Sequence, residues 1–358
     1  AALTLLWVGL QSDFTRSARV VGLKSDPQRQ SDSARSACVV GLKSDPRNLA
    51  MSRHIHLLAT GGTIAGEADP AGDGSRYTAG VRSVNTLLAT VPDLAAAAEI
   101  SAEQILSLDS KDITPTDWLQ ILAAARHALA DPAIDGLVIL HGTDTMEETA
   151  YFLHLSLPPG KPVVLTGAMR PADHPQADGP ANLRASVQLA ADDTAWNKGV
   201  LIVMNGTVHA ARWLGKARTT GLDAFNSPRP WAEARPDGRF ARCEPSTLPR
   251  VDILAGYAGA PADLIDACVT AGSRGLVLAL TGHGSIPAAW LPALRRARDK
   301  GVAILRASRC VGPVIRNANA DDDDEGWLTA GDLPPPKARI ALMLALATGK
   351  PGDWMNDL

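Results

Sequence analysis

Short runs of consecutive apolar residues alternate along most of this chain with longer segments in which apolar residues recur at helical spacing. Such short runs are typical of strands that are buried on both faces, as in a parallel sheet. This alternation predicts right-handed βαβ units and an α/β fold, with a mostly parallel sheet and helices on both of its faces. We expect strands at 54–59, 104–108, 136–140, 162–165, 200–204, 251–255, 275–280 and 302–305, and helices at 115–129, from 146 onward, and at 178–189, 261–271, 290–299 and 337–346.

The apolar pattern is interrupted after residue 225, where the sequence NSPRPWAEARPDGRF is typical of a loop and linker. With 358 residues, the chain is long enough for two domains with sizeable cores. We therefore expect an N-terminal catalytic α/β domain over 51–235, a linker over 236–250 and a smaller C-terminal α/β domain over 251–358.

The first fifty residues differ from the rest. Residues 11–27 and 30–46 are near-copies of each other, rich in Ser, Arg and Asp and without a sustained period. Such a composition favours poor order, so we expect a disordered extension over 1–50. Met51 stands just before the first convincing strand. Our hypothesis is that Met51 is the native start and that residues 1–50 are translated upstream sequence.

Composition excludes several classes of partner. The formal net charge of −3 gives no reason to expect nucleic acid or an anionic membrane as a partner. No apolar run approaches the roughly 20 residues of a membrane span. The four cysteines are widely scattered, without the spacing of metal ligands. This pattern suits a reducing compartment, and we expect a cytoplasmic protein without disulfides or a structural zinc ion.

Polar residues follow directly after the expected strand 136–140. The chain breaks at His141-Gly142, presents Thr143 and Asp144, and resumes at Thr145 as a helix with two glutamates in its first turn. In a parallel sheet, residues just past the carboxyl end of a strand face the crevice where ligands bind. Helix capping and the helix dipole would explain Thr145 and the glutamates. They do not explain Thr143 and Asp144, which we therefore take as the centre of a candidate site.

A second polar turn follows the strand 54–59, with the sequence TGGTIAG at 60–66. Its glycines fit neither the GxGxxG fingerprint nor a P-loop, which disfavours a nicotinamide-dependent dehydrogenase or a triphosphate site. We interpret these glycines instead as letting the backbone approach a small ligand and exposing Thr63. The glycine-rich stretch 67–80 around Tyr77 has the composition of a mobile lid.

The candidate chemistry is that of hydroxyls, carboxylates and one lysine, because the chain has no G-x-S-x-G or H-E-x-x-H motif. A threonine hydroxyl is a poor nucleophile and needs a base that a third group orients. Thr143, Lys216 and Asp144 are one such set. A lysine acts as a base only if its pKa falls towards neutrality, and a neighbouring Asp144 would oppose that shift.

Four stretches closely resemble the bacterial-type L-asparaginase/glutaminase amidohydrolases: LLATGGTIAG at 57–66, LVILHGTDTMEETAYFL at 137–153, KPVVLTGAMRP at 161–171 and DGPANL at 178–183. The resemblance is continuous from about Met51 to the C-terminus. It implies two α/β domains, no cofactor or metal, and a homotetramer built from intimate dimers. It also implies hydrolysis of L-asparagine to L-aspartate and ammonia.

The resemblance assigns roles to individual residues. Thr63, which matches the second Thr of TGGT, would be the nucleophile that forms an acyl-enzyme, and Tyr77 would assist it. Thr143, Lys216 and Asp144 would form a second, triad-like set. Backbone N–H groups, including that of Thr143, would stabilise the negative charge that develops on the amide oxygen.

The same resemblance implies the substrate contacts. Ser110 would bind the α-carboxylate of the substrate, and Asp144 its α-ammonium group. Further substrate-binding positions implied by the match are Gly62, Lys111, Thr143 and Ala168.

This chain departs from the family pattern around the substrate. Lys111 stands where many members have an uncharged residue, and its charge would repel an α-ammonium group unless Asp109 or Asp112 pairs with it. The Asn that periplasmic members supply to a neighbouring subunit's site corresponds to Gly259, and their intersubunit Glu falls near Ala320–Asp322. The disulfide cysteines of that class are also missing. Because fewer partners complete the site, we predict that asparagine is preferred over glutamine.

Three other functions remain open at this point. One is a glutaminase-asparaginase of broad specificity. Another is an amidase that acts on a larger amide, such as one on aminoacyl-tRNA, although no basic stripe supports it. The third is an inactive small-molecule sensor, against which the joint presence of the five candidate catalytic residues argues.

Overall fold

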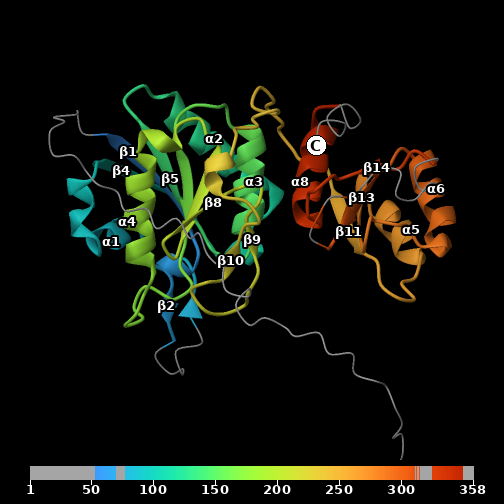
Figure 1. Cartoon of the computed structure of the whole chain (residues 1–358), viewed down its shortest axis with the longest axis horizontal. Helices are drawn as coiled ribbons and strands as arrows, with labels where there is room; N and C mark the ends of the chain where they lie inside the picture. Colours follow the sequence, from blue (N-terminus) through green and yellow to red (C-terminus); the bar gives the residue numbers. More distant parts are fainter. Residues whose placement is uncertain (1–52, 70–76, 311, 313, 315–324, 350–358) are drawn as a thin grey trace, which may run out of the picture. The chain divides into compact units, whose positions relative to one another are not determined.

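The computed structural model describes residues 53–69, 77–310, 312, 314 and 325–349 (Figure 1). The expectations about residues 1–50, Met51 and Ala320–Asp322 lie outside these ranges, as does most of the expected lid, since residues 70–76 are not described. No helix in the described ranges is long and apolar enough to cross a membrane.

The N-terminal domain is built on a six-stranded sheet in which only the last strand is antiparallel. Five strands are parallel, and β8 runs antiparallel to β7. The fold class predicted from the apolar pattern is therefore confirmed. In spatial order the strands are β4 (Glu99–Leu108), β1 (His54–Gly61), β5 (Gly136–Leu140), β6 (Val163–Thr166), β7 (Val200–Met204) and β8 (Thr207–Ala210).

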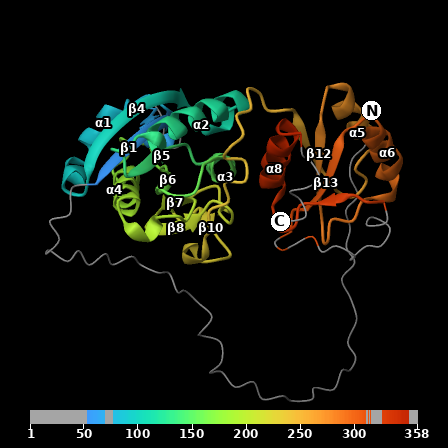
Figure 2. The same cartoon turned by 90° about the horizontal axis from the view of Figure 1, so that it is seen from above.

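Helices cover both faces of this sheet (Figure 2). On β5 every residue is buried, and alternate side chains join two different cores: Leu137 and Ile139 one, Val138 and Leu140 the other. This two-sided burial explains why the strand reads as an unbroken apolar run. Helices α2 (Pro115–Ala130) and α3 (Met146–Ser156) pack in the first core, and α1 (Val84–Ala89) and α4 (Gly179–Ala190) in the second.

The start of α2 shows how the sequence sets a helix boundary. Thr114 and Asp117 form a reciprocal capping box, in which each side chain accepts a hydrogen bond from the other's backbone N–H, and Pro115 takes the first helical position. Such a cap contributes on the order of 1 kcal/mol. The predicted helix start is confirmed.

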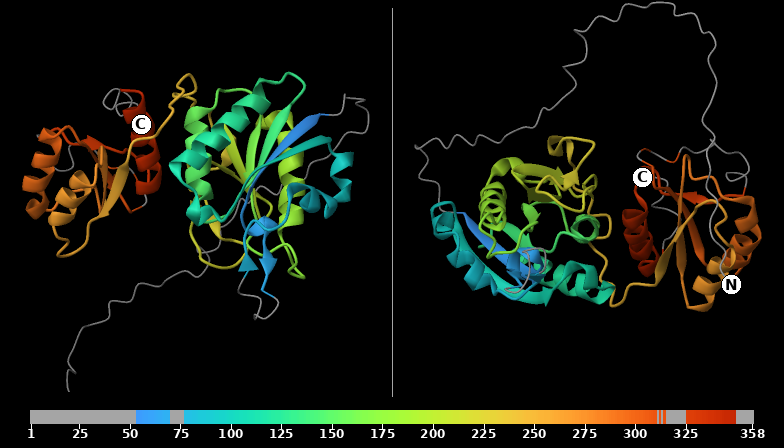
Figure 3. Two further views of the ribbon diagram at one scale, coloured as in Figure 1. Left: turned by 180° about the vertical axis from the view of Figure 1, so that it is seen from behind. Right: turned by 90° about the horizontal axis from the view of Figure 1, so that it is seen from below.

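The C-terminal domain contains a parallel four-stranded sheet (Figure 3). Its strands are β11 (Val251–Ala255), β12 (Gly275–Leu280), β13 (Ala303–Ser308) and β14 (Leu328–Thr329). Helices α5 (Asp263–Thr270) and α6 (Leu291–Asp299) pack on one face of this sheet, and α8 (Pro335–Ala347) packs on the other. Helix α8 also contacts α3 of the N-terminal domain and shares its core.

Several short elements escaped the apolar pattern because two to four residues carry too little periodicity. Besides β8 and β14, the two-residue strands β2 (Glu67–Ala68) and β3 (Tyr77–Thr78) pair with each other, as do β9 (Gly215–Lys216) and β10 (Phe225–Asn226). The boundaries proposed at 235/236 and 250/251 stay predictions. Short 3-10 turns lie at Thr63–Ala65, Pro92–Ala96, Ser110–Asp112, Asp193–Ala195, Trp231–Glu233 and Ala288–Trp290.

Candidate active site

Two glycines bring the two polar turns into backbone contact. Strands β1 and β5 are neighbours in the sheet, so the turns that follow them emerge side by side. Gly62 has a φ of 81°, and a Cβ on it would lie 2.3 Å from both the Cα and the N of Gly142. Only glycine allows this approach. Thr63 and Thr143, which follow these glycines directly, are therefore delivered to the same edge of the sheet.

Thr63 forms a hydroxyl pair with Tyr77. Its side chain is 5 % exposed, and its Oγ1 donates a hydrogen bond of 2.8 Å to the phenolic oxygen of Tyr77. Tyr77 reaches this position because it pairs with Ala68 in the β2–β3 ladder, a few residues after Thr63. Spacing in the sequence alone would not have singled out Tyr77, but the structure brings it to the expected partner.

Lys216 joins Thr143 and Asp144. Its Nζ donates hydrogen bonds of 3.0 Å to Thr143 Oγ1 and 2.6 Å to Asp144 Oδ1. The lysine lies on β9, which pairs with β10, and its own backbone N–H donates to Glu147 Oε2 over 2.9 Å. Three residues that resemblance grouped together thus form one hydrogen-bonded set. Glu147, which we had assigned only to the helix dipole, also anchors the lysine.

Ser110 ties a third strand end to the same turn. It follows β4 and is 1 % exposed, and its Oγ accepts a hydrogen bond from the N–H of Asp144 over 3.1 Å. Thr145 occupies the N-cap position of α3, but its side chain caps no N–H of the helix. It donates instead to the carbonyl oxygen of Ser110 over 2.7 Å. The interpretation of Thr145 as a helix cap was therefore wrong, since its hydroxyl links two loops.

The positive charge of Lys111 is balanced by two aspartates of its own loop. Its Nζ lies 2.9 Å from Asp109 Oδ2 and 2.8 Å from Asp112 Oδ2. Hydrogen bonds to these two carboxylates raise the pKa of Lys111 above its usual value. Lys111 is therefore paired with both of the acids that the sequence offered, so its charge does not prevent an α-ammonium group from binding nearby.

The turn after β6 lies against the same site. A Cβ on Gly167 would come within 2.5 Å of the carbonyl oxygen of His141, and Ala168 is fully buried. The Asp178 carboxylate holds this turn, because it accepts hydrogen bonds of about 3 Å from the N–H groups of Met169 and Arg170. The sequence identified the start of α4 here but gave no sign that Asp178 organises the preceding loop.

His141 contributes an uncharged ring beneath the turn. It is fully buried, and this burial lowers its pKa to about 4. Its Nδ1 lies 2.6 Å from the carbonyl oxygen of Gly142, and its Nε2 has no hydrogen-bond partner among the described residues. These contacts fit a role in shaping the backbone at Gly142.

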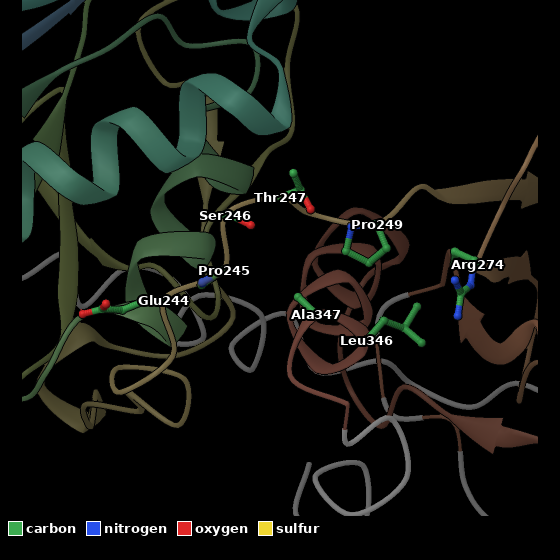
Figure 4. Close-up of a pocket in the computed structure, with 8 residues that line it drawn as sticks. All are labelled: Glu244, Pro245, Ser246, Thr247, Pro249, Arg274, Leu346 and Ala347. Atoms are coloured by element: carbon green, nitrogen blue, oxygen red, sulfur yellow. The ribbon is translucent and has the colours of Figure 1, made fainter.

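The remaining candidate positions lie outside this cluster. Gly259 supplies no side chain to a site because it is a glycine, and a Cβ added to it would meet only open space. In the described ranges, no group of three or more His, Cys, Asp and Glu residues could hold a metal ion. A cavity of about 400 Å³ contains none of the candidate residues (Figure 4). It is lined by Glu244, Pro245, Ser246, Thr247, Pro249, Arg274, Leu346 and Ala347.

Both halves of the chain match family models. The "Asparaginase, N-terminal" model matches residues 54–239, and the "Glutaminase/Asparaginase C-terminal domain" model matches residues 250–357. The chain belongs to the asparaginase/glutaminase family and is an asparaginase-type amidohydrolase.

Several named relatives cover most of the chain. It is 41 % identical to the "Probable L-asparaginase periplasmic" of Haemophilus influenzae, over 85 % of this chain and 91 % of the relative. It is 40 % identical to L-asparaginase 2 of Escherichia coli, over 85 % and 92 %, and 36 % identical to the glutaminase-asparaginase of Pseudomonas fluorescens, over 82 % and 86 %. The crystal structure of a probable cytoplasmic L-asparaginase from Campylobacter jejuni matches with a TM-score of 0.75 and 37 % identity, over 83 % of this chain and 95 % of that one.

Proposed function

We propose that this protein hydrolyses the side-chain amide of L-asparagine to L-aspartate and ammonia, with Thr63 as the nucleophile. The observation that carries the proposal is the meeting of two hydroxyl sets at one sheet edge: Thr63 with Tyr77, and Thr143 with Lys216 and Asp144. Nucleophilic catalysis by a threonine needs a hydrogen-bonded partner that takes part in proton transfer. Thr63 donates to the Tyr77 oxygen, and Thr143 accepts from Lys216.

In the first step, Thr63 Oγ1 attacks the amide carbon and passes its proton to the Tyr77 oxygen along the existing hydrogen bond of 2.8 Å, while Tyr77 gives its own hydroxyl proton to the amide nitrogen. The carbon–nitrogen bond then breaks. The nitrogen, which has taken up this proton, leaves as ammonia, and the acyl group stays on Thr63 as an ester. Among the described residues the N–H of Thr143 has no hydrogen-bond partner, so it is available to stabilise negative charge on the amide oxygen.

In the second step, water cleaves the ester and restores the Thr63 hydroxyl. We assign activation of this water to the set of Thr143, Lys216 and Asp144. Lys216 must be neutral to accept a proton, and its contact with Asp144 opposes this. When the substrate's α-ammonium group binds Asp144, whose side chain is 52 % exposed, the carboxylate is shared and its hold on Lys216 weakens.

The substrate's α-carboxylate is assigned to the loop at Ser110, beside the N–H of Asp144. Gly62 and Ala168 form the walls of the site through their backbones, because neither offers a polar side chain. Lys111 keeps its ion pairs with Asp109 and Asp112, and the α-ammonium group of the substrate binds Asp144.

The assay that tests the proposal is ammonia release from L-asparagine, compared between the natural protein and Thr63→Val. We expect the variant to lose at least about 10³-fold in kcat while it still binds asparagine, because valine keeps the shape of threonine and removes the nucleophile. Thr207→Val at the exposed start of β8 serves as a matched control. Substantial activity in Thr63→Val would show that the nucleophile is misassigned, and binding by the natural protein without ammonia release would favour the sensor.

A glutaminase-asparaginase is the second candidate, favoured by the 36 % identity to a relative of that name. We propose that asparagine is preferred, since Gly259 supplies no side chain that could help to enclose a longer substrate. Comparing kcat/KM for the two amides decides between the candidates. Equal values would contradict the preference.

We propose in addition a homotetramer, as the resemblance implies, and sedimentation of the protein in solution tests this. A cytoplasmic location also stays a proposal, because the names of the relatives include both a periplasmic and a cytoplasmic protein. The free thiols of Cys243, Cys268 and Cys310 are compatible with a reducing compartment.

A further inference from the structure

Lys337 is a buried cation that the proposed chemistry does not use. It lies in the first turn of α8 in the C-terminal domain, and its side chain is 1 % exposed. Burial lowers its pKa to about 7. Removing an ammonium group from water costs several kcal/mol unless its surroundings compensate for the lost hydration. The position of this cation therefore calls for an explanation.

The ammonium group of Lys337 binds backbone rather than a carboxylate. Its Nζ donates a hydrogen bond of 2.9 Å to the carbonyl oxygen of Arg212 and one of 2.6 Å to that of Leu214. It also lies 5.8 Å from the centre of the Tyr151 ring on α3. The nearby charged groups are Glu147 on α3, Arg212, and Asp332, which forms an ion pair with Arg212. Two charge-assisted hydrogen bonds thus fix one short stretch of main chain.

That stretch leads directly to Lys216. Leu214 is followed by β9, Gly215–Lys216, so Lys337 holds the backbone two residues before the lysine. On the other side, Glu147 accepts the backbone N–H of Lys216 itself. The backbone of Lys216 is therefore held from α8 and from α3, while its Nζ reaches Thr143 and Asp144.

We propose that Lys337 is a positioning residue for the reaction, which holds the segment 212–216 so that Lys216 meets Thr143 and Asp144. The inference rests on the proposed function, in which Lys216 takes part in catalysis. A methionine at 337 would fill the same space but leave the two carbonyl groups without the donor that Lys337 supplies, which is unfavourable in a buried site. The segment would then relax, and small displacements of a catalytic group can lower rates by about 10²-fold.

A double-mutant cycle tests whether Lys337 acts through Lys216. We expect Lys337→Met to lower kcat for asparagine by at least about tenfold, with little change in KM. In a Lys216→Met background the same substitution should change kcat by less than about twofold, because the group that it positions is gone. Lys300→Met, at an exposed position after α6, is the matched control and should leave kcat unchanged.

The outcomes separate the possible failures. Equal losses in both backgrounds would mean that Lys337 only supports the fold, and an unchanged kcat in Lys337→Met would also overturn the inference. If Lys216→Met alone keeps full activity, the proposed function fails instead. Should Lys337→Met not fold, Lys337→Gln replaces it in the cycle with the same expected outcomes, because its amide is uncharged and one bond shorter and so weakens the two hydrogen bonds without putting an apolar group in their place.

Discussion

The Thr63–Tyr77 pair and the Thr143–Lys216–Asp144 set lie at the same sheet edge but are held in different ways. The first consists of two neutral hydroxyls, and its tyrosine, 39 % exposed, sits on a ladder of two residues per strand. The second contains a cation and a carboxylate. Its lysine is held by α3 and by β10, and the segment before it by Lys337 of the C-terminal domain.

This difference indicates a division of labour. A hydroxyl pair on a short ladder can adjust to each substrate and acyl group, whereas a charged set must be fixed so that its geometry does not depend on solvent. We therefore expect substitutions in the first pair to change the chemistry alone, and those around the second set to change stability as well.

We expect the largest effect from Gly62→Ala, because this substitution would disturb the turns that carry both sets. The added methyl group would lie 2.3 Å from backbone atoms of Gly142, at a φ of 81° that alanine rarely adopts. We expect activity to disappear and the free energy of unfolding to fall by about 2 kcal/mol or more. Ammonia release measures the activity, and urea unfolding measures the free energy of unfolding. Gly206→Ala, at a positive φ but in open space, separates the strain from the contact.

Next in size is Lys216→Met, which should lower steady-state kcat by about 10²–10⁴-fold. Because we assign Lys216 to the second step, the acyl-enzyme on Thr63 should accumulate and be seen as a mass increase after acid quenching. Turnover without any such adduct would show that the two sets do not divide the steps between them.

A smaller loss is expected for Tyr77→Phe, which removes the oxygen that accepts the Thr63 proton. We expect kcat to fall by about 10–10²-fold. The unfolding midpoint should stay the same because the side chain is partly exposed. A fall in thermal stability as large as that of Lys216→Met would remove the contrast between the two regions.

The smallest effect on activity, but a measurable one on stability, concerns His141 under the second set. Its folded pKa of about 4 lies below the unfolded value of 6.5, so only the unfolded chain takes up a proton between these values. The free energy of unfolding should therefore fall as the pH drops from about 6.5 to 4. Urea unfolding of His141→Asn should show a shallower pH dependence than the natural protein, and an equal dependence would contradict the assignment.

Most of the fold could be predicted because strands that are buried on both faces appear in the sequence as continuous apolar runs. Gly136–Leu140 and Val200–Met204 are continuous apolar runs, and the structure has them with the same bounds. The two-residue strands around Tyr77 and Lys216 could not be found in this way. Their pairing depends on how the rest of the fold positions them, and a strand of two residues is too short to show a periodic pattern.

The candidate site was predictable to the extent that strand order brings its members together. Thr63 and Thr143 follow neighbouring strands, so a parallel sheet alone accounts for their meeting. The anchors of Lys216 were not predictable. The sequence assigned Glu147 to the helix dipole and placed Lys337 only at the start of the last expected helix, because their contacts join residues far apart in the chain.

The contact between Lys337 and the segment before Lys216 also bears on when the enzyme can begin to work. A ribosome completes the N-terminal domain first, with both threonines, Tyr77, Asp144 and Lys216 already present. Lys337, whose ammonium group binds the segment before Lys216, is added only when the C-terminal domain is translated, after all of these residues. If Lys337 positions Lys216, a nascent or stalled chain would carry every reacting group and still not turn over substrate at the full rate until α8 has docked.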